Sequence, residues 1–240
     1  MHAPAPVATL PPVTYRQFHP RRLFLIAALL FAVSCAHAQV NEDEMGAWYA
    51  WFYNRNIDDT PWATQMIVQR RNWDTHGDLQ QRLILGLVSY KPADHPIRYG
   101  LGYYHLRNGT PGPSSVTRDA HIVFQQGLYT RLLGERNYFT GRLRLEEHMP
   151  DDSDSFRRLR TYLSINRPLN RTTLDAGAVY LSLYDEHFLE LDNVGYALNR
   201  AYAGLGWKMT DHTSWQVGIM RQSTRTYAKN FWMFNLFHHY

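Results

Sequence analysis

The side chains best placed for chemistry in this sequence are arginines, glutamates and tyrosines that recur at every second position. In residues 136–148 and 156–167 they alternate with leucines, so each segment presents one charged face and one apolar face. Rows of arginine on neighbouring strands could line an anion-selecting pore. Arginines paired with glutamates and tyrosines could instead fill the inside of a narrow closed sheet, and the need to pair buried charges favours this second interpretation. The residues of this lumen network are Arg142, Arg144, Glu146, Arg158, Arg160, Tyr162, Tyr180, Tyr184, Glu186, Arg200 and Tyr202.

A second pattern that could do chemistry is the triplet His212-Thr213-Ser214. This spacing puts an imidazole and a hydroxyl on one strand face, where the imidazole can activate the serine as a nucleophile. The triplet resembles the His-x-Ser spacing of outer-membrane phospholipase and lipid A deacylase barrels, which work at the outer-leaflet rim. Because His212 and Ser214 fall at a short turn expected on the periplasmic side, we interpret them as an ordinary turn. An outer-leaflet lipid-modifying enzyme stays open as an alternative function.

Metal ligands and cofactor motifs do not stand out. His238 and His239 point to opposite faces of a strand, so they cannot easily share a metal ion, and metal-ligand spacing is absent elsewhere in the sequence. His105 and His121 have neither a serine nor a carboxylate at a useful spacing. We therefore predict no metal and no cofactor, and interpret these histidines as girdle or lumen residues.

The N-terminal residues have the three parts of a secretory signal peptide. A segment containing three arginines precedes the apolar run 23–33, and small residues alternate just before Ala38. We predict a signal peptide over residues 1–38, with cleavage after Ala38 that leaves Gln39 as the first residue. The apolar run is too short for a membrane-spanning helix, which needs about 20 residues. Lipidation of Cys35 is the alternative.

Removal of this leader changes the charge balance. The full chain has 25 Lys and Arg, and the leader holds three of them and no acidic residue, so 22 remain against 21 Asp and Glu. The remaining chain is close to neutral and lacks the clustered basic face that nucleic-acid binding requires. Cys35 is the only cysteine, so the chain after the leader has no thiol chemistry.

Residues 39–240 resemble a succession of strands. Segments of about ten residues alternate in polarity and are separated by turn residues. The segments are 45–53, 61–71, 78–90, 97–107, 117–132, 136–148, 156–167, 173–186, 194–208, 213–225 and 230–240. The connections 91–96, 133–135, 168–171 and 209–212 are short and alternate with longer polar ones, as periplasmic turns and extracellular loops do in outer-membrane barrels.

This pattern predicts an all-β fold with one domain, a single up-and-down antiparallel transmembrane β-barrel over residues 39–240. Single-chain bacterial barrels have an even number of strands. The eleven segments therefore imply either ten strands, if residues 45–53 are not a full wall strand, or twelve, if two strands have been merged.

The chain ends in a strand whose last residue is aromatic. One face of this strand carries Trp232, Phe234, Leu236, His238 and Tyr240. Such a strand resembles the C-terminal assembly signal of bacterial outer-membrane barrels. We therefore expect the outer membrane of a Gram-negative bacterium as the location, and outer-membrane lipids and the barrel assembly machinery as partners. A secreted soluble β-sheet protein, which would show the same alternation, is a further alternative.

Several short motifs together resemble a known family. They are Gly46-Ala47-Trp48, Arg70-Arg71, Gly100-Leu101-Gly102-Tyr103, Arg142-Leu143-Arg144-Leu145-Glu146, Arg158-Leu159-Arg160 and Leu205-Gly206-Trp207-Lys208. The sequence resembles the proteobacterial and bacteroidete barrels grouped as domain of unknown function 2490. This resemblance implies a barrel in the outer membrane and no assigned activity or catalytic residues. The predicted role is structural or that of a narrow channel.

Overall fold

The computed structural model describes residues 44–111, 117–192 and 195–240, in which all regular structure is β-strand. The predicted signal peptide, Cys35 and the cleavage site at Ala38 and Gln39 lie outside the described residues. The strands are β1 Gly46–Asn56, β2 Trp62–Asn72, β3 Leu79–Tyr90, β4 Ile97–Gly109, β5 Thr117–Leu133, β6 Asn137–Pro150, β7 Phe156–Pro168, β8 Val179–Glu190, β9 Gly195–Lys208, β10 Thr213–Thr224 and β11 Ala228–His239.

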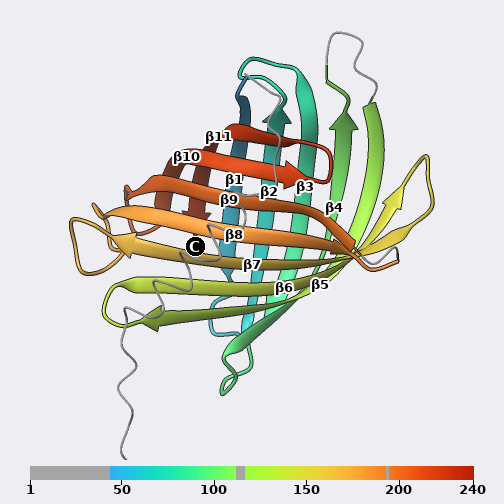
Figure 1. The fold of residues 1–240 in the computed structure, drawn as a ribbon. Helices are drawn as coiled ribbons and strands as arrows, with labels where there is room; N and C mark the ends of the chain where they lie inside the picture. Colours follow the sequence, from blue (N-terminus) through green and yellow to red (C-terminus); the bar gives the residue numbers. More distant parts are fainter. Residues whose placement is uncertain (1–43, 112–116, 193–194) are drawn as a thin grey trace, which may run out of the picture. The chain divides into compact units, whose positions relative to one another are not determined.

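The strands form a closed barrel in which each strand pairs with its neighbours in sequence (Figure 1). All of these sequential pairs are antiparallel, from β1 with β2 to β10 with β11. The barrel closes where β1 meets β11, and this pair is parallel, with Gly46 opposite Phe231 and Asn54 opposite His239. The predicted all-β, up-and-down barrel is therefore confirmed.

The predicted strand number of ten or twelve is wrong, because the barrel has eleven strands. Strand direction alternates around an antiparallel barrel, so an odd number leaves one pair of neighbours running the same way. This parallel pair lies at the closure of the barrel, between β1 and β11. A parallel ladder is only slightly less stable per residue than an antiparallel one. The ten-strand alternative left residues 45–53 out of the wall, but β1 is a full wall strand of 11 residues.

Alternation of side chains gives the wall two different faces. Along β3, Leu83, Leu85 and Leu87 are buried inside the barrel, whereas Ile84 and Val88 are exposed on its outer surface. The strands of 11 to 17 residues are longer than the five or six usual in soluble sheets.

The two ends of the barrel are called the N-terminal rim, where β1 begins and the connections after β2, β4, β6, β8 and β10 lie, and the C-terminal rim, where β11 ends. One connection at the C-terminal rim differs from expectation. Strand β8 begins at Val179, so residues 169–178 form a long connection in place of the predicted short turn. The Asn170 side chain holds it, donating to the Gly177 carbonyl at 3.0 Å and accepting from the Val179 N–H at 2.7 Å. Loop length therefore does not distinguish the rims as predicted.

Apolar side chains fill part of the barrel interior. This differs from the prediction of a lumen lined by charged and polar residues. One cluster lies on the inner faces of β2 to β5 and a second lies between β1, β9, β10 and β11. The first contains Ile67, Leu83, Leu85, Leu87, Tyr104, Leu106, Ala120, Ile122 and Phe124. The second contains Trp48, Tyr202, Met220, Phe231 and Met233. The charged residues predicted for the lumen occupy the remaining inner wall, on β6 to β9.

Candidate functional site

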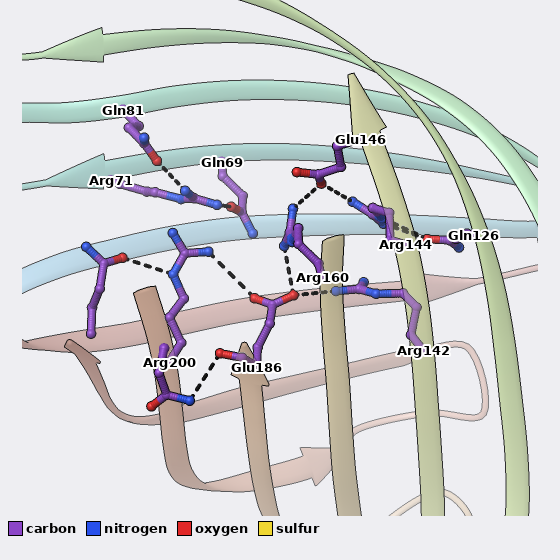
Figure 2. A network of polar contacts seen from close by, with 12 residues as sticks. Gln69, Arg71, Gln81, Gln126, Arg142, Arg144, Glu146, Arg160, Glu186 and Arg200 are labelled. Atoms are coloured by element: carbon purple, nitrogen blue, oxygen red, sulfur yellow. Dashed lines mark hydrogen bonds and ion pairs between the residues drawn. The ribbon is translucent and has the colours of Figure 1, made fainter. Parts of the chain in front are cut away.

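Arginines and glutamates meet inside the barrel, mainly on the inner faces of β6 to β9 (Figure 2). Strand alternation turns their side chains inward, so that Arg144 is 3% exposed while its neighbour Leu143 is 53% exposed on the outer face. Cross-strand register places Arg144 opposite Arg160 and Glu186 opposite Arg200. We call this set the arginine–glutamate cluster. It comprises Arg71, Arg142, Arg144, Arg158, Arg160, Arg200, Glu146, Glu186 and Glu190.

Glu186 on β8 is the centre of one half of this cluster. Its Oε1 accepts hydrogen bonds from Arg142 Nη2 at 2.5 Å and from Arg160 Nη2 at 2.8 Å. The other oxygen, Oε2, lies 3.6 Å from Arg200 Nη1. One carboxylate with three guanidinium groups is a strongly charge-assisted arrangement. It joins β6, β7 and β9 to β8 through side chains alone.

Glu146 on β6 organises the other half. Its Oε1 accepts from Arg160 Nη1 at 2.6 Å and lies 3.7 Å from Arg144 Nη1, while its Oε2 is 2.8 Å from His148 Nε2. Arg144 also donates through Nε and Nη2 to the Gln126 side-chain oxygen, at 3.0 and 2.7 Å. Because Arg160 binds both Glu146 and Glu186, the two halves form one network.

Aromatic rings cover the arginine planes that face the middle of the barrel. Arg144 lies 4.0 Å from the Phe124 ring centroid, and Arg160 lies 4.4 Å from that of Phe188. Arg200 lies 4.6 Å from Phe188. These cation–π contacts are favourable for desolvated guanidinium groups, so the network is stabilised by packing as well as by charge.

The predicted tyrosines form a stack beside the cluster. Tyr184 lies between Tyr162 and Tyr202, with ring centroids 5.3 and 4.8 Å away. Arg142 lies 4.9 Å from the Tyr162 ring. Tyr180 is set apart, and its hydroxyl accepts a hydrogen bond from Gln216 at 3.1 Å. The structure thus places all eleven predicted lumen residues on the inner face, but Tyr180 does not join the network.

Arg71 and Trp48 belong to the same interior and were missed by sequence reasoning. Arg71 on β2 hydrogen-bonds the side chains of Gln69 and Gln81 and lies 4.0 Å from the Trp48 ring. Arg200, on the far side of β10 and β11, lies 4.8 Å from the same ring. The available signal was the alternation of Ile67, Gln69 and Arg71 along one strand face, but a contact across the barrel has no local sequence pattern.

Positive charge exceeds negative charge in this interior. Among the described residues, the cluster holds six arginines and three glutamates. One of the glutamates, Glu190, lies near the N-terminal rim, and its Oε1 is 3.6 Å from Arg158 Nη2. The buried Nε atoms of Arg142, Arg158 and Arg160 have no hydrogen-bond partner in the described residues. The interior is therefore suited to anions and unfavourable for cations.

The two central carboxylates of this cluster are almost fully buried. Glu146 is 1% exposed and Glu186 is 5% exposed, so water scarcely reaches either carboxylate. A side chain lining an open pore would be exposed to that pore. Both carboxylates are therefore enclosed by neighbouring side chains and do not line an open pore.

The His-x-Ser triplet does not form a catalytic pair. His212 is exposed in the turn after β9, where its Nδ1 lies 2.8 Å from the His239 carbonyl oxygen and its ring stacks on Tyr240. Ser214 is buried on the inner face of β10. No hydrogen bond joins the two side chains in the part of the chain that the structure describes.

The outer face carries two histidine groups near the N-terminal rim. His105 and His121 lie opposite each other on β4 and β5, and His121 Nδ1 is 2.6 Å from the Tyr103 hydroxyl. His187 on β8 forms an ion pair with Asp185 at 2.5 Å. No hydroxyl of the described residues is hydrogen-bonded to His187, so this acid–base pair lacks a nucleophile. No group of three potential metal ligands occurs within residues 44–111, 117–192 and 195–240.

The predicted assembly face of β11 points outward. Trp232 and Leu236 are exposed, Phe234 stacks on Tyr49 with centroids 5.2 Å apart, and His238 Nδ1 accepts from Trp51 Nε1 at 2.8 Å. The backbone of Tyr240 extends the parallel ladder, since its N–H donates to Asn54 O at 2.9 Å and its carbonyl accepts from Asn56 at 2.7 Å. The last residue therefore helps to close the barrel.

Comparison with known proteins gives one result. A family model described as "Protein of unknown function (DUF2490)" matches residues 45–233, which include ten complete strands and half of β11. No curated protein and no solved structure matches the chain. Among the described residues, no helix is long and apolar enough to cross a membrane.

Proposed function

Given that the chain belongs to the family of unknown function DUF2490, we propose that it is an outer-membrane β-barrel of a Gram-negative bacterium with a structural role. In this proposal the arginine–glutamate cluster closes the interior. The C-terminal strand is the segment recognised by the barrel assembly machinery, and the outer face contacts membrane lipids.

The outer face carries the observation on which this proposal rests. Outward positions on β2, β3 and β4 form an apolar band, in which Ile84 is 57% exposed and Leu101 is 70% exposed. Large exposed apolar surfaces of this kind are rare on soluble proteins and mark contact with membranes or partners. The band contains Met66, Val68, Ile84, Val88 and Leu101.

The band has the limits expected of a membrane-facing belt. At its limit near the C-terminal rim, three aromatic side chains lie side by side, as in an aromatic girdle: Trp62, Tyr90 and Tyr99. At its other limit lie Arg70 and Arg82. The strand rise between Trp62 and Arg70 corresponds to about 20 Å of membrane thickness at a typical barrel tilt, close to the band of about 25 Å in outer-membrane barrels.

Outside this band, β8 and β9 carry polar groups on the outer face. Asp185 and His187 point outward in the half of β8 nearer the N-terminal rim, and Asn199 Nδ2 donates to Asp185 at 2.6 Å. These polar groups satisfy one another, which lowers the cost of facing the edge of a bilayer. The soluble-protein alternative would need polar groups of this kind over the whole outer face.

Membrane fractionation and gel mobility test the proposal. Mature protein should fractionate with outer membranes, and unboiled samples should migrate differently from boiled samples on SDS gels. Recovery as a soluble periplasmic protein without a heat shift would reject the barrel in the membrane. Planar-bilayer recordings test the closed interior, for which we expect no steady conductance.

A narrow anion channel is the second candidate, and the excess of arginine over glutamate in the interior favours it. Steady conductance with anion selectivity would support the channel over the closed barrel. The lipid-modifying enzyme has no comparable support, because His212 and Ser214 lie apart and no hydroxyl of the described residues is hydrogen-bonded to His187.

A further inference from the structure

A row of arginines crosses the outer face of three neighbouring strands near the N-terminal rim. Arg70 on β2 lies directly opposite Arg82 on β3, and Arg82 lies directly opposite Arg107 on β4. All three side chains are exposed. Residues directly opposite on one face have Cβ atoms about 5 Å apart, and like charges at this spacing are destabilising. An anion bound beside the row would offset this repulsion.

Among the described residues, a carboxylate pairs with the row at only one end. Arg107 donates through Nε and Nη2 to both oxygens of Asp119, each at 2.8 Å. Arg70 donates only to neutral groups, the Asn72 side chain at 3.1 Å and the Gly77 carbonyl at 3.3 Å. Neither Arg70 nor Arg82 forms an ion pair with a carboxylate of the described residues. Two adjacent guanidinium groups are thus left for an external ligand.

The place of the row on the outer wall indicates the ligand. One step toward the middle of the barrel, the outward positions are Val68 on β2 and Ile84 on β3, both exposed and apolar. A ligand that contacts both pairs of residues must place an apolar part beside Val68 and Ile84 and an anionic part beside Arg70 and Arg82. A phospholipid or phosphorylated glycolipid has this construction, and guanidinium groups bind phosphate with two parallel hydrogen bonds.

We propose that Arg70 and Arg82, flanked by the Arg107–Asp119 pair, bind the phosphate groups of a membrane lipid whose acyl chains cover the adjacent apolar band. This inference rests on the proposed function as a membrane barrel. If the C-terminal rim faces the periplasm, the lipid lies in the outer leaflet and is a phosphorylated glycolipid. Two neighbouring arginines suit a headgroup with more than one phosphate.

Lipid titration followed by native mass spectrometry tests the site on the folded mature barrel in a neutral detergent. The probe is diphosphorylated lipid A, and the variant is Arg70→Gln combined with Arg82→Gln. A basic residue near a membrane surface contributes roughly a fivefold gain in binding, so the double variant should bind about 25-fold more weakly. Fully dephosphorylated lipid A should bind the unmodified protein as weakly as it binds the double variant.

Arg131→Gln is the matched control. Arg131 is also an exposed, outward arginine, but it lies on β5 near the C-terminal rim and its cross-strand partner is Phe139. Its substitution should leave lipid A binding unchanged. If the double variant fails to fold, Arg82→Gln alone serves, since Arg82 has no side-chain hydrogen bond to another described residue, and about a fivefold loss is expected.

The outcomes separate this inference from the proposed function. A protein that shows a heat shift and enters bilayers, but whose double variant binds lipid A as tightly as the unmodified protein, overturns the lipid site alone. Displacement of lipid A by millimolar inorganic phosphate would also overturn it, because the site would then recognise free phosphate. A protein that never enters bilayers rejects the proposed function.

Discussion

Glu186 offers the sharpest test of the arginine–glutamate cluster, because a single carboxylate there serves three arginines. The substitution Glu186→Gln keeps the side-chain volume and one acceptor oxygen but removes the charge. Arg142 and Arg160 would then lose their shared charged acceptor, and Arg200 would lose its carboxylate neighbour. The change therefore creates uncompensated buried positive charge while disturbing the packing little.

The expected cost follows from the burial of this group. Breaking a buried ion pair by removing one partner costs about 3–5 kcal/mol, and we expect about 3 kcal/mol because the glutamine can still accept one hydrogen bond. This corresponds to roughly a 100-fold change in the folded-to-unfolded ratio. With an m-value of about 2 kcal/mol per molar urea, the unfolding midpoint falls by about 1.5 M. Tryptophan fluorescence in detergent micelles measures it.

Glu190→Gln provides the matched control. Glu190 is on the same face of the same strand, but its side chain is 31% exposed and only one arginine, Arg158, is near it, at 3.6 Å. Pairs with this degree of solvent access contribute at most about 1 kcal/mol. If Glu186→Gln shifts the midpoint no further than Glu190→Gln does, the buried network does not stabilise the barrel in the way described.

Three further outcomes are expected. Met66→Arg, midway between Trp62 and Arg70 in the apolar band, should reduce insertion into lipid vesicles by about 2–4 kcal/mol, whereas Met66→Leu should insert normally; equal insertion would exclude lipid contact there. Deletion of Tyr240 removes two backbone hydrogen bonds to β1 and should lower the yield of heat-modifiable protein in outer-membrane fractions, with periplasmic aggregate in its place. The Asp74 carboxylate accepts hydrogen bonds from the N–H groups of His76, Gly77 and Asp78, which hold its pKa below the usual value. Its stabilisation of the β2–β3 turn is therefore complete above the unfolded pKa of about 3.9 and is lost as pH falls through the folded pKa. An NMR titration of Asp74 with a midpoint at or above about 3.9 would contradict this.

The sequence predicted the faces of β6 to β9 correctly because charge and leucine alternate there without a break. Arg144 and Leu143 must face opposite ways on any strand, and only one of the two faces can hold paired charges. The same reasoning had less to use on β2 to β5. There Leu83, Ile84 and Leu85 are all apolar, so periodicity does not tell an inner face from an outer face, and the apolar interior was not foreseen.

Other differences come from information that a local pattern does not hold. The contact of Arg71 and Arg200 with the Trp48 ring joins β1, β2 and β9 across the barrel. The late start of β8 depends on the hydrogen bonds of Asn170 to Gly177 and Val179, although Thr173 and Leu174 are compatible with a strand. The strand number was misjudged because a rule about antiparallel closure was applied to a barrel that closes with a parallel pair.

The charged interior and the apolar interior together explain how the register of the wall is set. A slip of one residue turns every side chain to the opposite face. On β6 such a slip would place Arg142, Arg144 and Glu146 on the outer surface, which in the proposed membrane barrel would cost about 2–4 kcal/mol for an arginine near the middle of the bilayer. The arginine–glutamate cluster therefore fixes the pairing of β6 to β9, whatever it contributes to net stability.

On β2 to β5 the penalty for a slip is smaller, because both faces carry leucine, isoleucine and valine. Polar groups at the strand ends take over this role. Inside, Gln81 donates to Asn108 across β3 and β4 at 2.7 Å, and outside, Arg82 lies at the limit of the apolar band. A slip would bury Arg82 among the leucines and expose Gln81. If the lipid phosphates proposed above bind Arg70 and Arg82, they reinforce this register in the membrane, so the lipid site would support folding of the half of the wall whose interior is mainly apolar.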